Sequence, residues 1–137
     1  MKEALGHLFN VVPLADGVEI DVRNVSAVTF VCTGNDTFTV EESTADDGTG
    51  AQDLDVVDRY YTNTSTAGGA AWVLATQTAD ADVTIGSGSA VFTVDVNAMS
   101  DGFDYLECTS ASSGTVAAIL HGLAVQRAPQ NLPQLAA

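Results

Sequence analysis

The residues best suited to chemistry are carboxylates that gather in one polar stretch of the chain. Asp46, Asp47, Asp53, Asp55 and Asp58 follow one another closely. Closely spaced carboxylates supply the several oxygen ligands that a hard cation such as Ca²⁺ takes. The EF-hand pattern of alternating acids, a central Gly and a terminal Glu is missing, and Asp-x-Asp is too common to be specific. A solvated acidic loop is therefore the preferred interpretation, and a structural cation site is the alternative.

Imidazole, thiol and hydroxyl groups show no spacing typical of a reaction centre. The chain has only two histidines and two cysteines, the residue types that usually bind zinc: His7, His121, Cys32 and Cys108. No two of them lie close together in the sequence. There is no G-x-S-x-G segment, and Gly86-Ser87-Gly88 lacks the rest of a dinucleotide-binding fingerprint. We therefore expect that the protein is not an enzyme and that it needs no cofactor. We expect no catalytic, cofactor-binding or metal-binding residue.

Net charge restricts the partners. Eighteen acidic residues stand against four basic ones (Lys2, Arg23, Arg59 and Arg127), which gives a net charge of −14. Nucleic acid is excluded as a partner because its binding needs clustered Lys and Arg. An anionic membrane surface is disfavoured for the same reason, and no apolar run approaches the ~20 residues of a membrane helix. The carboxylates either keep the protein soluble or attract a basic partner surface.

The N-terminal segment is a poor signal peptide, since Glu3, Gly6 and His7 interrupt its apolar residues. Without secretion, Cys32 and Cys108 are expected to be buried thiols and not a disulfide.

Alternation of apolar and polar residues predicts that the chain folds from β-strands. The alternation is clearest where Ala90, Phe92, Val94 and Val96 alternate with Val91, Thr93, Asp95 and Asn97. Ala27–Thr33 is apolar on both faces, as in a central strand. Ala27–Thr33 and Thr37–Glu41 are expected to pair as a hairpin, and the three apolar runs of Ala90–Arg127 as an antiparallel meander. Further strands are expected over residues 18–22, 54–61, 70–76 and 82–85, the first with a solvated acidic face. The fold class is therefore all-β, with a single antiparallel β-sandwich or barrel-like domain and extended terminal arms.

The domain is expected to span residues 1–127. Residues 1–15 are expected to form either an N-terminal arm or a first strand, with Pro13 at an edge or at the end of the strand. Residues 128–137 are expected to be an extended, Pro-containing C-terminal tail. Such arms bind neighbours by adding a strand or lying in a groove. The candidate interface residues are the apolar and Pro residues of the two arms: Leu5, Leu8, Phe9, Pro129, Leu132, Pro133 and Leu135.

Five aromatic residues have two interpretations. Tyr60, Tyr61, Trp72, Phe103 and Tyr105 could form a sugar-stacking platform or a protein interface. The preferred interpretation is that they fill the core of a small sandwich.

Residues 26 to 127 resemble small virion proteins of tailed bacteriophages, the group that includes capsid decoration proteins. The resemblance lies in an ordered series of segments: FTVEES (Phe38–Ser43), ADDGTGAQDLDVV (Ala45–Val57), YYTNTSTAGGAAW, TVDVNAMSDGFDYLECTSAS and TVAAILHGLAVQR. Members of the group commonly show a loop of acids and Gly, which falls here on residues 47–54. They also show a D-x-x-x-M/L-x-D-G-F-D-Y-L/V link, which falls here on residues 95–106.

The resemblance implies a β-rich, non-enzymatic, high-copy subunit that is assembled in the host bacterial cytoplasm and lies on the capsid surface of the virion. The expected function is that of a capsid decoration (cement) protein that binds the outer face of the major capsid lattice. The implied partners are the phage major capsid protein and the chain itself, with a homotrimer allowed, and neither nucleic acid nor membrane. The alternatives are a phage tail component (a tail-tube or minor tail protein) and a carbohydrate-binding host-attachment module.

Overall fold

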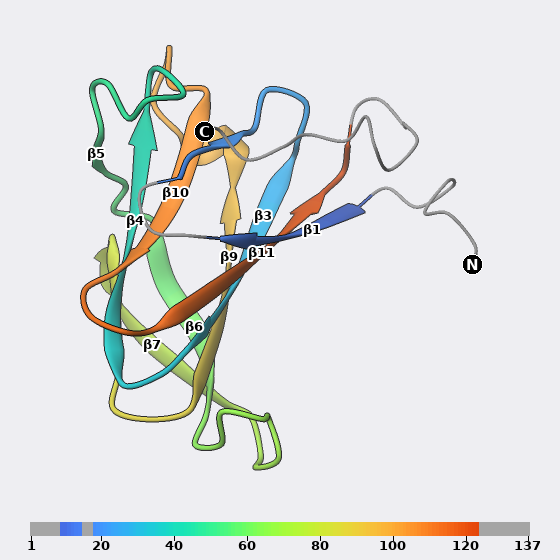
Figure 1. The fold of residues 1–137 in the computed structure, drawn as a ribbon, viewed down its shortest axis with the longest axis vertical. Helices are drawn as coiled ribbons and strands as arrows, with labels where there is room; N and C mark the ends of the chain where they lie inside the picture. Colours follow the sequence, from blue (N-terminus) through green and yellow to red (C-terminus); the bar gives the residue numbers. More distant parts are fainter. Residues whose placement is uncertain (1–8, 15–17, 124–137) are drawn as a thin grey trace.

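The alternating segments of the sequence form the strands of two antiparallel sheets that pack face to face (Figure 1). The computed structural model describes residues 9–14 and 18–123. The all-β sandwich expected from the sequence is confirmed. The strands are β1 (Phe9–Leu14), β2 (Ile20–Asp21), β3 (Ala27–Thr33), β4 (Asp36–Ser43), β5 (Gln52–Asp53), β6 (Val57–Asn63), β7 (Val73–Asp80), β8 (Asp82–Ile85), β9 (Ser89–Asp95), β10 (Tyr105–Ser110) and β11 (Thr115–His121), and a 3₁₀ turn, η1 (Val96–Ala98), follows β9.

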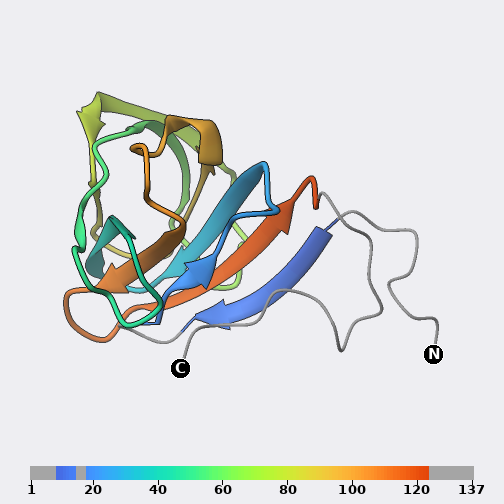
Figure 2. The same cartoon turned by 90° about the horizontal axis from the view of Figure 1, so that it is seen from above.

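The larger sheet has six strands in the order β1-β11-β3-β9-β6-β7. The smaller sheet has the order β2-β10-β4-β5, with β8 paired to the same side of β4 as β5. Seen from above, the two layers lie on opposite sides of the core (Figure 2). The central position expected for Ala27–Thr33 is confirmed, because β3 lies between β11 and β9 along its whole length.

Two pairings expected from the sequence are wrong. Strands β3 and β4 do not form a hairpin, because β3 belongs to the larger sheet and β4 to the smaller one. The three strands of the expected meander are likewise divided: β9 and β11 flank β3, whereas β10 lies between β2 and β4. Alternation indicates which face of a strand is buried but not which strand pairs with it, and a short turn can cross between sheets as easily as within one.

The crossings between the sheets depend on glycine. The turn from β3 to β4 lies beside the turn from β8 to β9, and the Gly34 N–H donates a hydrogen bond to the Gly88 carbonyl at 2.9 Å. Gly88 has a positive φ of 92°, and a Cβ there would lie 1.8 Å from the Asn63 carbonyl oxygen. No side chain fits at this position, so the β8–β9 turn packs against the end of β6 only because residue 88 is glycine.

The core is formed by the inward residues of both sheets. Phe30 and Phe92 are cross-strand neighbours whose ring centroids lie 5.6 Å apart, and both are buried. Cys32 and Cys108 are buried in opposite sheets and form no disulfide, as expected for buried thiols. The other large, fully buried apolar side chains are Ile20, Val22, Val28, Phe38, Val40, Val83, Val94, Leu106 and Leu120.

The segment at residues 18–22 differs from expectation. Its strand, β2, is only two residues long, and Glu19 is buried instead of lying on a solvated face. Gly48 of the acidic loop packs against Glu19, so closely that a Cβ on Gly48 would lie 2.6 Å from Glu19 Oε1. The loop therefore covers the position that alternation alone assigns to solvent.

The described part of the N-terminal segment, Phe9–Leu14, is a strand. Strand β1 pairs with β11 at the edge of the larger sheet, and Pro13 occupies an edge position, as expected. Phe9 is the first residue of this strand and pairs with His121. The other candidate interface residues, Leu5, Leu8, Pro129, Leu132, Pro133 and Leu135, lie outside the described residues, as does the tail at residues 128–137.

Truncation of Phe30 tests the position of the core. Phe30→Ala removes a fully buried ring and is expected to lower the free energy of unfolding by about 3–5 kcal/mol. The matched control is Thr115→Ala, which truncates an exposed residue away from the core and should change stability by less than about 0.5 kcal/mol. Urea denaturation followed by circular dichroism measures both, and equal losses for the two variants would contradict the described core.

Candidate functional site

The five carboxylates of the polar stretch do not converge. All five are exposed, and those with hydrogen bonds hold turns together. Asp47 Oδ1 accepts the Thr49 N–H at 3.0 Å, and hydrogen bonding from Thr49 lowers the pKa of Asp47. Asp55 accepts the Ala81 N–H at 3.2 Å. Among residues 9–14 and 18–123, no three His, Cys, Asp or Glu side chains are grouped so that they could hold a metal ion.

A carboxylate that the sequence analysis did not single out, Asp36, ties three segments together. Its Oδ2 accepts hydrogen bonds from the Ser110 hydroxyl at 2.5 Å and from the N–H groups of Ser112 and Gly114 at 3.0 and 2.7 Å. Its Oδ1 accepts the Thr37 N–H at 2.8 Å. These bonds, led by that from Ser110, lower the pKa of Asp36 to about 2. With its oxygens occupied in this way, Asp36 anchors the β10–β11 turn to the start of β4.

The other end of β4 carries a second buried carboxylate. Glu42 Oε1 accepts a hydrogen bond from Gln52 Nε2 at 2.7 Å, and Oε2 accepts the Ser100 N–H at 2.9 Å. These contacts fix β5 and the turn after η1. Phe38, Val40 and Glu42 share one face of β4, so the period of two in DTFTVEES is the signal that places Glu42 inward.

The outer face of the smaller sheet is acidic. Glu41 stands opposite Asp53 on one side and opposite Glu107 on the other, so three carboxylates follow one another across three strands. Asp53 is exposed and Glu41 half-buried, whereas Glu107 is buried. Asp82 lies on the same face and accepts a hydrogen bond from the Thr39 hydroxyl at 2.6 Å. Opposed like charges destabilise a sheet, so no packing requirement explains this row. We call this surface the acidic face.

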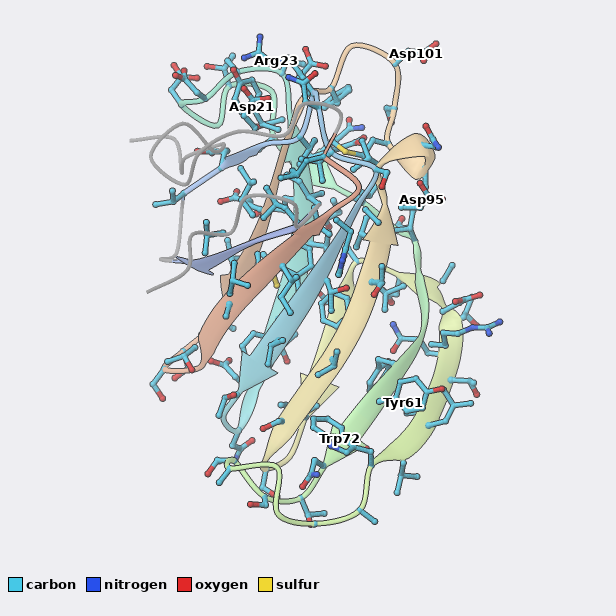
Figure 3. All side chains as sticks on the ribbon, turned by 90° about the vertical axis from the view of Figure 1, so that its right-hand side faces the viewer. Asp21, Arg23, Tyr61, Trp72, Asp95 and Asp101 are labelled. Carbon is cyan, nitrogen blue, oxygen red and sulfur yellow. The ribbon has the colours of Figure 1, made fainter. Side chains whose placement is uncertain are left out.

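The outer face of the larger sheet is apolar instead. Strand register places Leu74, Tyr61, Val91, Val31 and Ala117 opposite one another in succession, one from each of five adjacent strands. All five are exposed or half-buried. A second row contains Ile119 and the exposed Val11. We call these seven residues the apolar face, and Figure 3 views the larger sheet from this side, with Tyr61 labelled.

Charge is found at the margins of the apolar face. Between its apolar residues lie threonines, and a 2.7 Å hydrogen bond joins the hydroxyls of Thr29 and Thr93. Asp58 and Arg59 lie 3.7 Å apart where the β6–β7 register shifts, and Asp95 ends β9. His121 Nε2 lies 2.8 Å from Thr29 Oγ1, at the end of β11. The solvent-facing side of an antiparallel sheet is usually polar or charged. An outer face made of aliphatic groups and threonine is therefore unusual in so acidic a chain.

The preferred interpretation of the aromatic residues is wrong for Tyr61 and Trp72. These side chains are 51% and 46% exposed, and the adjoining Val73 and Leu74 are 60% and 50% exposed. Tyr60, by contrast, packs against the core. Adjacent strand residues point to opposite faces, so Tyr60 and Tyr61 cannot both be inside. Phe103 and Tyr105 are half-buried.

A cavity of about 420 Å³ opens where β6 separates from β9. Pairing of the two strands extends only from Tyr61–Val91 to Asn63–Ser89, and beyond it the gap is lined by Arg59, Phe92 and Thr93. The volume lies within the range of small-molecule sites, but the lining combines apolar groups with an exposed Asp58–Arg59 pair. Such a lining suits an inserted apolar side chain of a protein partner better than a reaction.

The comparisons with known proteins yielded nothing: no family model, no curated protein and no solved structure matches this chain significantly. Within the described part of the chain, no helix has the length and apolar character needed to cross a membrane.

The pH dependence of stability tests the role assigned to Asp36. Because its pKa lies near 2 and below the ordinary 3.8, its contribution to stability is complete above about pH 4. That contribution is lost as the pH falls from about 4 towards 2. We therefore expect Asp36→Asn to melt below the wild type at pH 7 and the difference between them to shrink through this window.

Thermal melting followed by circular dichroism between pH 2 and pH 7 measures this difference. Asp101→Asn, on an exposed turn, is the matched control. A difference between Asp36→Asn and the wild type that is constant across the window would contradict the assigned role.

Proposed function

We propose that this chain is a non-enzymatic structural protein of a tailed-bacteriophage virion, a decoration protein that binds the outer face of the major capsid lattice. The observation that carries the proposal is the contrast between the two outer faces of the sandwich. One is a row of apolar residues across five strands, and the other is a row of carboxylates. The residue pattern that resembles small virion proteins supports the same assignment.

The apolar face is the surface proposed to contact the capsid. Contiguous apolar surface on a soluble protein commonly marks a site of protein association. Tyr61 and Leu74 project from it, and aromatic residues are enriched where proteins meet. The cavity beside Tyr61 and Val91 would receive an apolar side chain from the capsid protein.

The acidic face would then be turned away from the lattice. A net charge of −14 opposes contact with packaged DNA, which favours the outside of the head as the location. The same charge keeps many copies dispersed before assembly, because like-charged molecules repel in solution.

A second candidate function, carbohydrate binding for host attachment, is favoured by one observation. Tyr61 and Trp72 are both substantially exposed and lie on the same hairpin, β6–β7. Exposed aromatic rings provide apolar faces on which sugars can stack. Binding to a glycan array in the absence of any head would support this function and oppose the first.

Addition of purified protein to heads assembled without it tests the proposed function. The wild type should co-sediment with such heads, and it should neither form tubes alone nor bind glycans. Tyr61→Ser removes an exposed ring and Val31→Thr replaces a methyl by a hydroxyl of similar shape, so both should weaken co-sedimentation, roughly tenfold for a loss of about 1.4 kcal/mol. Thr84→Glu, on the other sheet, is the control and should bind like the wild type.

Failure of the wild type to bind heads would contradict the proposed function. Assembly of the pure protein into rings or tubes would instead identify a tail component.

A further inference from the structure

Strand β7 is an edge strand with little of the usual protection against pairing. The larger sheet has two edges, β1 and β7. Strand β1 carries Pro13, which has no N–H to donate to a further strand. Strand β7 contains no proline, and its first charged residue is Asp80 at its end. Its register with β6 shifts after Thr76, so Val73–Thr76 is the regular part of this edge.

The regular part of the edge is also apolar on both faces. Trp72, Val73 and Leu74 are consecutive and each is about half exposed, at 46%, 60% and 50%. Alternation sends Leu74 to the outer face beside Tyr61 and Val73 to the inner face beside Thr62. Three consecutive exposed apolar residues are unfavourable in an isolated strand and are typical of one that has a partner.

The charge distribution indicates which partner fits. Residues 60 to 79 contain no charged side chain, the longest such stretch in a chain with eighteen acidic residues. Two copies that met through their acidic surfaces would oppose carboxylate to carboxylate. Two copies that meet through β7 oppose only uncharged residues.

We propose that β7 pairs antiparallel with β7 of a second copy of this chain, forming a two-fold dimer with one continuous twelve-stranded sheet. Pairing of a strand with its own copy is isologous, because each copy offers the same surface. A two-fold axis perpendicular to the sheet keeps the outer faces of both copies on one side. The dimer then adds main-chain hydrogen bonds along the edge of β7 that, among the described strands, pairs with none.

The register that suits this edge is centred on Leu74. It places Leu74 against Leu74 of the second copy on the outer face and Val73 against Ala75 on the inner face. Trp72 then lies opposite Thr76 of the second copy. The apolar faces of the two copies become continuous, although the pairing depends on the edge strand alone and does not require the proposed capsid function. A two-fold dimer also differs from the homotrimer that the resemblance allows.

A charge exchange at Leu74 tests the proposal. Leu74→Glu and Leu74→Arg each place two like charges at the two-fold axis, and each should raise the dimer dissociation constant about a hundredfold or more. A mixture of the two variants should recover a dimer that contains one copy of each. Thr115→Glu and Thr115→Arg introduce the same charges at an exposed site away from the edge and should remain dimeric. Circular dichroism establishes that each variant is folded.

Analytical ultracentrifugation of the full chain provides the measurement, at ionic strengths from about 0.05 M to about 0.5 M. Because both copies are acidic, salt should tighten the dimer, whereas pairing with a basic partner would weaken with salt. Val31→Thr should leave the dimer intact even where it impairs head binding, which separates this proposal from the proposed function. A monomeric or trimeric wild type, or a dimer that Leu74→Glu leaves unchanged, would overturn the proposal.

Discussion

The pairing of β3 between β9 and β11 is the constraint on which the remaining structure depends. Its register places Phe30 beside Phe92 in the core and, one residue later, Val31 between Val91 and Ala117 on the outer face. A shift of one residue in any of these strands would exchange the two sets of side chains. The buried core and the apolar face are therefore two consequences of one alignment, and neither can change without the other.

The outer sides of the two sheets differ in charge. The carboxylates of β4, β5 and β10 share the outer side of the smaller sheet, while the outer side of the larger sheet carries threonine and aliphatic groups. Two buried carboxylates, Asp36 and Glu42, have a different task, since they fix turns at the two ends of β4. Acidic groups thus lie both at the turns around β4 and on the outer side of the smaller sheet, and the outer side of the larger sheet is uncharged except at its margins.

Much of the fold could be predicted from the sequence because alternation is a local property. Apolar residues on both faces identified Ala27–Thr33 as central, and the period of two predicted the strand that begins at Ala90. A short strand was expected over residues 82–85, and the missing N–H of Pro13 favoured an edge position. Which strands pair with one another could not be predicted. Strands β3 and β4 are joined by a turn as short as that of a hairpin and yet belong to different sheets. The aromatic residues were assigned to the core because they are large and apolar. The adjacency of Tyr60 and Tyr61, and the lack of charge from residue 60 to 79, were the signals that one side of this hairpin is a surface.

The central claim is that the outer side of the larger sheet is a contact surface and that the acidic side faces solvent. Cryo-electron microscopy of virions that contain this chain tests it most directly, because the orientation of each sheet is visible in the map. The account predicts density on the outside of the head, with Val31, Tyr61 and Val91 against the capsid lattice and Glu41 and Asp53 turned outward. Density in the tail, or a subunit bound to the head through its acidic face, would contradict it.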